Sequence, residues 1–401
     1  MIGSLLKDAS SVEEKAFILS RILQDHHLHS ILPEREKQQM VEFTLLLLQT
    51  QKLLGYQLTA LLLLHGMLPL SGIHNILERF MYHIEHLQSK DESTAFSQLI
   101  PGVLQYPSED IQMKVSAMFP KLISSCLKLI HNESTRIFGF ELILEFIKFR
   151  NIPSQALFQI RNICLDHLDE PIYHASTTHI FAYSYWHATY DEWTSSWALL
   201  CSYIQECLHH LGLSKTLSSS DGAFHSSLSH KIRTKSGVSK ALLLQRILHG
   251  LFQLMIRMLN AGNPNFFISM DVRPLIETIS VLLPYSIEAT THNLDTTMIT
   301  ENQSQVSPAA ILLILPEIKL DCIQLIHALI LNYHQACASC MPTVLRFLSI
   351  CLSLHQAKHP RLTDQLLKTL TLVIQTSPSL VSQVSTKIPL DCMCSNITLV
   401  W

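Results

Sequence analysis

Residues 41–62 read VEFTLLLLQTQKLLGYQLTALL. Apolar residues recur in this stretch at intervals of three and four, at Val41, Leu45, Leu48, Leu53, Leu54, Leu58, Leu61 and Leu62. Because an α-helix turns once every 3.6 residues, this spacing places them on one face of a helix. Sustained alternation of apolar and polar residues, the pattern of a half-buried strand, does not occur in the sequence. The stretch therefore predicts helices with one buried face.

The same period recurs along the chain, for example over 73–87, 118–129, 138–149 and 157–168. Prolines fall between the periodic segments, and proline is favoured in the first turn of a helix. Consecutive helix pairs occupy about 35–45 residues, the length of HEAT and armadillo-like repeats. We therefore predict an all-α fold, an α-solenoid of HEAT/armadillo-like helical pairs with two polar insertions. A closed helical domain would show the same pattern.

Two polar stretches interrupt this pattern and define the predicted segments. The stretch 212–240 is rich in Ser and has one acid, whereas 289–307 is rich in Thr, Asn, Gln and Ser. Both compositions predict exposed linkers. The resulting division comprises an N-terminal helical-repeat array at 1–211, a Ser-rich basic linker at 212–240, a helical-repeat segment at 241–288, a polar linker at 289–307, and a C-terminal helical-repeat segment with a frayed end at 308–401.

Glycine is scarce and widely spaced, with 11 among 401 residues and no two closer than six positions. Phosphate-binding loops and the serine-hydrolase elbow need glycines at closer, fixed spacings, because only glycine lets the backbone approach a ligand so closely. The spacing excludes these sites, and we expect no cofactor. Hydrophobic residues make up 48% of the chain and charged residues 15%, which is typical of helices buried on two sides.

The overall charge is close to neutral, since 29 Lys and Arg residues face 32 Asp and Glu residues. Such a balance provides no global field for nucleic acid or an anionic membrane. The first 25 residues contain no apolar core of a signal peptide, and the longest apolar runs are short or interrupted by polar residues. We therefore expect neither secretion nor a membrane span. Ten dispersed cysteines then indicate a reducing compartment.

A Cys-x-x-Cys motif occurs at Cys337 and Cys340, with His334 before it and Cys351 and His355 after it. Zinc needs four converging ligands, and no second pair follows at a matching spacing. The same two positions suit one face of a helix in an apolar run, where cysteine behaves as a small hydrophobe. We therefore favour packing over a metal or redox site. The 22 histidines form no His-Glu-x-x-His motif, and no catalytic residue is assigned.

A short leucine box is formed by Leu58, Leu61 and Leu62. Amphipathic boxes of this kind dock into grooves on partner proteins. In a segment so rich in leucine, burial in the core is the default interpretation, and the box stays a candidate.

A basic cluster within the predicted linker is the second candidate, at Lys231, Arg233, Lys235 and Lys240. Such a cluster suits a nuclear import signal or contact with RNA phosphates, and it also suits a solvated linker. No aromatic residue lies between the basic ones, which disfavours base stacking.

Six stretches follow one another in a characteristic order. They are 55–64 (GYQLTALLLL), 73–87, 182–186 (AYSYW), 193–211, 243–251 (LLQRILHGL) and 315–330 (LPEIKLDCIQLIHALI). Together with the polar linker at 212–240, this order resembles the RIX-type helical region of the RIX/PELP pre-rRNA-processing family, the proline-, glutamic acid- and leucine-rich proteins. The likeness covers most of residues 40–350.

The resemblance implies a non-enzymatic scaffold for large ribosomal subunit (pre-60S) assembly in the nucleolus and nucleoplasm. Members of that family work with a WD-repeat protein and another helical-repeat protein in removing the second internal transcribed spacer, so contact with RNA is expected to be indirect or weak. Some animal members are also transcriptional coregulators that use several leucine boxes, of which this sequence has one. The family's acidic, proline-rich tail is missing, so we expect a fragment, an alternative product or a reduced member.

Two other function classes stay open at this point. The first is a helical-repeat adaptor in nucleocytoplasmic transport or trafficking, which would repeat regularly at about 40 residues without the 212–240 insertion. The second is a helical enzyme with a dispersed active site, whose catalytic residues no single sequence would reveal.

The incomplete ligand set around Cys337 and Cys340 predicts that the purified chain carries no stoichiometric zinc. Elemental analysis of the dialysed protein measures the metal content directly. Zinc near one equivalent per chain, lost in a Cys337→Ser variant, would contradict the packing interpretation.

Overall fold

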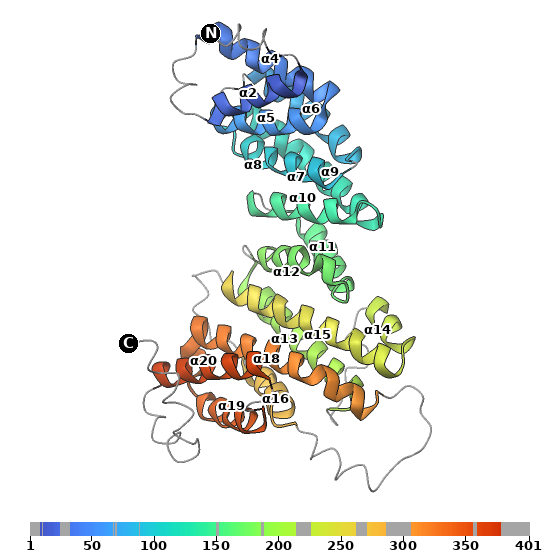
Figure 1. Ribbon diagram of the computed structural model, residues 1–401, viewed down its shortest axis with the longest axis vertical. Helices are drawn as coiled ribbons and strands as arrows, with labels where there is room; N and C mark the ends of the chain where they lie inside the picture. The colour runs from blue at the N-terminus through green and yellow to red at the C-terminus, as the bar shows by residue number, and fades with distance from the viewer. Residues whose placement is uncertain are drawn as a thin grey trace. The chain divides into compact units, whose positions relative to one another are not determined.

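A computed structural model of the chain describes residues 9, 11–24, 33–66, 68, 70–87, 89–149, 152–185, 188–213, 226–261, 271–285, 306–355 and 359–377 (Figure 1). In these residues all secondary structure is helical, which confirms the predicted all-α class. The solenoid arrangement stays a prediction. The contacts divide the chain into two compact units, Met1–Ile160 (unit 1) and Arg161–Trp401 (unit 2), and each is described by itself.

Unit 1 is built around helix α5, which packs against α2, α4, α7 and α8 and also contacts α6 through Tyr56 and His83. Helix α9 packs on α6 and on α10. The helices are α2 (Val12–Gln24), α4 (Glu34–Thr50), α5 (Lys52–Leu64), α6 (Leu70–Glu85), α7 (Lys90–Ser97), α8 (Leu99–Leu104), α9 (Glu109–His131), α10 (Arg136–Phe149) and α11 (Ser154–Asp166), in which the boundary between the units falls.

The stretch 41–62 forms two helices in place of one, because the backbone leaves helical geometry at Gln51 with φ −137° and ψ 78°. Helices α4 and α5 then fold back on each other. A side chain at Gly55 would lie 2.6 Å from the backbone nitrogen of Leu48, so glycine is what permits this close approach. Leu48 and Leu58, which the spacing placed on the apolar face, are both buried.

Unit 2 contains two series of helices in contact. Helices α12, α15, α18 and α20 touch in that order, and so do α13, α16 and α19. The two series meet where α13 contacts α15 and where α19 contacts α20. The elements are η1 (Pro171–Tyr173), α12 (His174–Tyr183), α13 (Tyr190–His210), α14 (Ser226–Arg233), α15 (Gly237–Asn260), α16 (Arg273–Leu282), α18 (Pro308–Cys337), α19 (Met341–His355) and α20 (Pro360–Thr376).

Helices α15 and α18 run parallel and side by side in unit 2 (Figure 1). Three side-chain pairs join them at a nearly constant separation in sequence, which sets their direction and register. The pairs of this α15–α18 polar seam are His249–Asp321 at 2.9 Å, Gln253–Gln324 at 3.4 Å and Asn260–Asn332 at 3.0 Å. Fully buried apolar residues such as Leu248 and Leu325 lie on both helices beside the seam.

A buried lysine ties α18 to the end of α16. Lys319 is completely buried, and its Nζ donates hydrogen bonds to the carbonyl oxygens of Leu283 at 2.9 Å and Tyr285 at 2.8 Å. These carbonyls follow the last turn of α16, where backbone oxygens have no helical partner. Burial lowers the pKa of Lys319. The ammonium group thus satisfies carbonyls that the chain leaves without partners inside the helix.

The predicted linker at 212–240 is wrong over its second half, because α14 and the first turn of α15 lie within it. Leu228 and Ile232, one helical turn apart, are completely buried. Because Ser and basic residues surround this pair in the sequence, its apolar spacing does not stand out as a helix. Residues 214–225 of this linker, most of the linker predicted at 289–307 and the predicted frayed end beyond residue 377 lie outside the described residues. The predicted segment boundary at 211 does not coincide with the unit boundary, which follows Ile160.

Among the described residues, α15 is the one helix long and apolar enough to cross a bilayer. Within its most apolar window, 61% is buried inside the protein, and Arg246 and Arg257 are exposed on it. This burial is what a core helix of a packed unit shows.

We predict that Lys319→Met destabilises unit 2 by about 1–3 kcal/mol, because it leaves the Leu283 and Tyr285 carbonyls without their donor. The substitution keeps the length of the side chain, so the effect reports the ammonium group. Urea unfolding followed by circular dichroism measures it. Lys368→Met is the matched control, since Lys368 pairs with Asp364 in an exposed position. Equal unfolding midpoints for the two variants would contradict the prediction.

Candidate functional site

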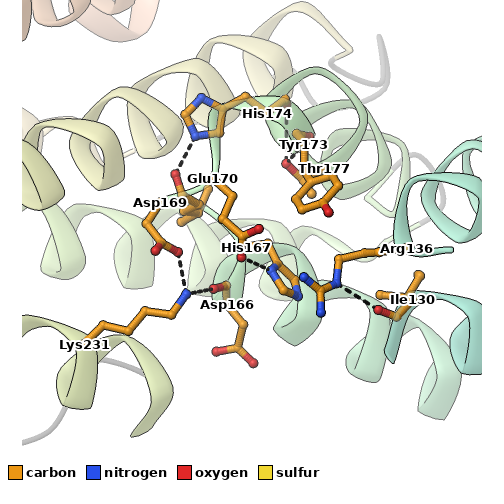
Figure 2. A network of polar contacts seen from close by, with 11 residues as sticks. Ile130, Arg136, Asp166, His167, Asp169, Glu170, Tyr173, His174, Thr177 and Lys231 are labelled. Carbon is orange, nitrogen blue, oxygen red and sulfur yellow. Dashed lines mark hydrogen bonds and ion pairs between the residues drawn. The ribbon is translucent and has the colours of Figure 1, made fainter. Parts of the chain in front are cut away.

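Polar side chains gather in unit 2 around the turn that follows α11 (Figure 2). His174, the first residue of α12, donates through Nε2 to the carbonyl oxygen of Leu168 at 2.5 Å. His167 Nδ1 and a carboxylate oxygen of Glu170 lie 2.7 Å apart. The turn also places Asp169 next to α14, where its carboxylate accepts a hydrogen bond from Lys231. These contacts fix the turn and the start of α12.

Lys231 of the predicted basic cluster is part of this network. Its Nζ lies 2.7 Å from Asp169 Oδ1 and 3.2 Å from the carbonyl oxygen of Asp166 (Figure 2). The Asp169 side chain is 13% exposed and that of Lys231 36%. Lys231 therefore anchors α14 to the α11–η1 turn, and its charge is already compensated within unit 2.

The rest of the basic cluster divides between the core and the surface. Lys240 is buried, and burial lowers its pKa. Arg233 and Lys235 are exposed. Lys231 and Arg233 lie on α14, whereas Lys240 lies on α15. Lys235 lies between these helices, and the four residues therefore do not share one exposed surface. Import or RNA contact by this cluster would rest on Arg233 and Lys235.

A second polar group lies where α12, α15 and α18 meet. His249 Nδ1 bonds both carboxylate oxygens of Asp321, at 3.0 and 2.9 Å, and the rings of His174 and His249 lie 5.4 Å apart. The hydrogen bond to Asp321 raises the pKa of His249, and the Glu317 charge adds to this. Burial, with a contribution from His249, lowers the pKa of His174.

A paired histidine and aspartate can orient a general base, but such a base also needs a nucleophile within hydrogen-bond distance. In the part of the chain that the structure describes, the hydrogen bonds of His249 go to Asp321 and to no hydroxyl or thiol. The pair joins α15 to α18, and joining helices is the role that this geometry supports.

The leucine box lies in the core of unit 1. Leu58 and Leu62 are buried, with 2% and 0% exposure, and Leu61 is partly exposed. Docking into a partner groove requires these side chains on the surface. Leu58 and Leu62 therefore pack in the core, which is the default interpretation of this segment, and they help to hold α5 within unit 1.

Cys337 is the last residue of α18, and Cys340 lies in the turn before α19. The two cysteines therefore do not share the one helix face that their spacing predicts. His334 is exposed, whereas Cys351 is buried. Among the described residues, no group of three or more His, Cys, Asp or Glu side chains could hold a metal ion.

One histidine, His83, lies in the core of unit 1. The His83 ring is buried, and its Nδ1 lies 2.9 Å from the Tyr56 hydroxyl. Burial lowers the pKa of His83 to about 4, so the ring is neutral and packs against aromatic neighbours.

No role is predicted for Lys319, Asp321 and His249 from the sequence alone. Their signal was present, since a lysine and an aspartate stand close together in the otherwise apolar run 315–330. Charged residues inside an apolar helical face are rarely buried without partners. The identity of those partners, on α15 and after α16, required the three-dimensional structure.

Comparison of the sequence with protein-family models finds no match, and comparison with curated proteins finds none either. The resemblance drawn from the order of the six stretches therefore stays a prediction.

The raised pKa of His249 predicts a stability contribution that falls as the pH rises. A histidine whose pKa is higher in the folded state stabilises the fold fully below its unfolded pKa. The contribution disappears as the pH rises through the folded pKa. The coupling between His249→Gln and Asp321→Asn in a double-mutant cycle should therefore shrink between about pH 6 and about pH 8. Urea unfolding of the four proteins at each pH measures it, and a coupling that is constant with pH would contradict this assignment.

Proposed function

We propose that this protein is a non-enzymatic helical scaffold of a nuclear complex for pre-60S assembly and pre-rRNA processing. In this proposal it acts in the nucleolus and nucleoplasm, with a WD-repeat protein and another helical-repeat protein as partners. The observation that carries the proposal is the order of the six stretches that resemble the RIX-type region.

The position of the last stretch in the fold supports this interpretation. Residues 315–330 lie in α18, which contacts α15 and α20. The same stretch supplies Lys319 to the end of α16 and Asp321 to His249. In this chain the stretch thus carries polar residues with specific partners as well as leucines.

Exposed apolar side chains on unit 2 support the proposal that its partners are proteins. Leu313 and Leu331 on α18 are 67% and 60% exposed. Val238 and Leu242, one turn apart on α15, are also exposed. Burial of such side chains against a partner contributes to association through the hydrophobic effect.

The positions of the four basic residues also support protein partners over RNA. Lys231 is paired with Asp169 and Lys240 is buried, so Arg233 and Lys235 are the members of the basic cluster left at the surface. Two exposed cations neutralise few phosphates, and affinity for RNA rises with the number of phosphates neutralised. In this proposal, the protein binds the pre-ribosome mainly through its protein partners.

We predict that affinity purification of the tagged full chain recovers a WD-repeat protein and another helical-repeat protein, and that both stay bound at moderate salt. An apolar protein interface is much less sensitive to salt than a phosphate interface. Depletion of the protein should cause unprocessed large-subunit rRNA precursors to accumulate, measured by RNA blotting.

The double variant Arg233→Ser, Lys235→Ser separates import or RNA contact from partner binding, because both residues are exposed and α14 keeps its Lys231 anchor. Its partners should be retained while its nuclear fraction or RNA recovery falls, and Lys368→Ser on α20 should change neither. Recovery of only cytoplasmic transport factors, with rRNA processing unchanged on depletion, would rule out the proposed function.

A further inference from the structure

The turn between α18 and α19 holds two cysteines in direct contact. The Cys340 thiol and the Cys340 backbone N–H both donate to the carbonyl oxygen of Cys337, each at 3.0 Å. A turn closed by such a backbone bond keeps its end Cα atoms within about 7 Å, and a disulfide requires about 4.4–6.8 Å. The Cα separation that this turn allows therefore overlaps the range that a disulfide needs.

The two cysteines differ in their surroundings. Cys337 is buried at the end of α18, whereas Cys340 is partly exposed. The Cys340 carbonyl oxygen accepts the first helical hydrogen bond of α19, from the Val344 N–H, so Cys340 is the residue that begins this helix. The N-terminus of a helix stabilises a thiolate. The thiol hydrogen bond from Cys337 lowers the pKa of Cys340 to about 7.

The other described cysteines are poor candidates for oxidation. Cys126, Cys164, Cys201, Cys207, Cys322 and Cys351 are all buried. Burial raises the pKa of each of these thiols, which for Cys351 reaches about 11. The thiolate is the reactive form, so oxidation should be selective for Cys340 among these residues.

We propose that Cys337 and Cys340 form a reversible redox modification site, in which Cys340 reacts with a hydroperoxide and then closes a disulfide with Cys337. The Cys340 thiolate attacks the peroxide, an S–O bond forms and the O–O bond breaks, so the sulfur is oxidised and hydroxide leaves. The Cys337 sulfur then attacks the Cys340 sulfenic acid, an S–S bond forms and the S–O bond breaks. The departing hydroxide takes the Cys337 proton and leaves as water. A thiol reductant reverses the reaction by exchange.

The experiment treats the full chain with hydrogen peroxide, in a Cys392→Ser, Cys394→Ser background that removes the two cysteines outside the described residues. The protein should lose the mass of two hydrogen atoms, and peptide mapping should place one disulfide between Cys337 and Cys340 that dithiothreitol reverses. The Cys340→Ser variant should react at least about tenfold more slowly. Cys351→Ala, which removes a buried thiol of α19, should react at the unmodified rate.

The Cys337→Ser variant tests the second step separately. It should stop at the Cys340 sulfenic acid, which dimedone traps and which mass spectrometry detects. Alkylation by iodoacetamide adds a readout on the unsubstituted protein. The rate of Cys340 alkylation should rise with pH, with a midpoint near pH 7. A sulfenic acid that accumulates on Cys340 while Cys337 is present would overturn the proposal. So would a Cys340→Ser variant that folds and reacts with peroxide at the unmodified rate.

Discussion

A lysine ammonium group can leave water only where oxygen atoms take the place of its hydration shell. In unit 2, Lys319 meets this requirement with the carbonyls of Leu283 and Tyr285, beyond the last turn of α16. Two residues along the same helix, Asp321 holds His249 of α15. Positions two apart on a helix point to nearly opposite sides, so one short segment of α18 fixes the helix against two neighbours at once. The packing of unit 2 therefore depends on the hydrogen bonds made by Lys319 and Asp321.

The helical class could be predicted because the 3.6-residue period is a local property of the sequence, and it is visible over 41–62 as well as in α18. The surroundings of single polar residues were harder to predict. Lys231 meets a carboxylate 62 residues away, and no local pattern distinguishes it from Arg233, which stays exposed. The same limit applies to α14, where a buried pair at Leu228 and Ile232 was too short to stand out from its polar surroundings.

The polar contacts of the candidate site join structural elements to one another. Asp169 accepts from Lys231, His174 donates to the carbonyl of Leu168, and Asp321 accepts from His249. Each contact joins a different pair of elements, so the network holds helices together at their polar edges while apolar side chains fill the interior. The network therefore fixes the helix faces of unit 2 in register.

The parallel pairing of α15 and α18 has a consequence for how the chain reaches its native state. The members of the α15–α18 polar seam lie about 72 residues apart in sequence, whereas α4 and α5 meet through the single residue Gln51. Long separations slow folding, because the intervening chain must be ordered before the contact is formed. On the ribosome, the α4–α5 hairpin can therefore form early. Unit 2 cannot complete its packing until α18 has emerged, so the face of α15 that α18 covers stays in contact with water during that interval.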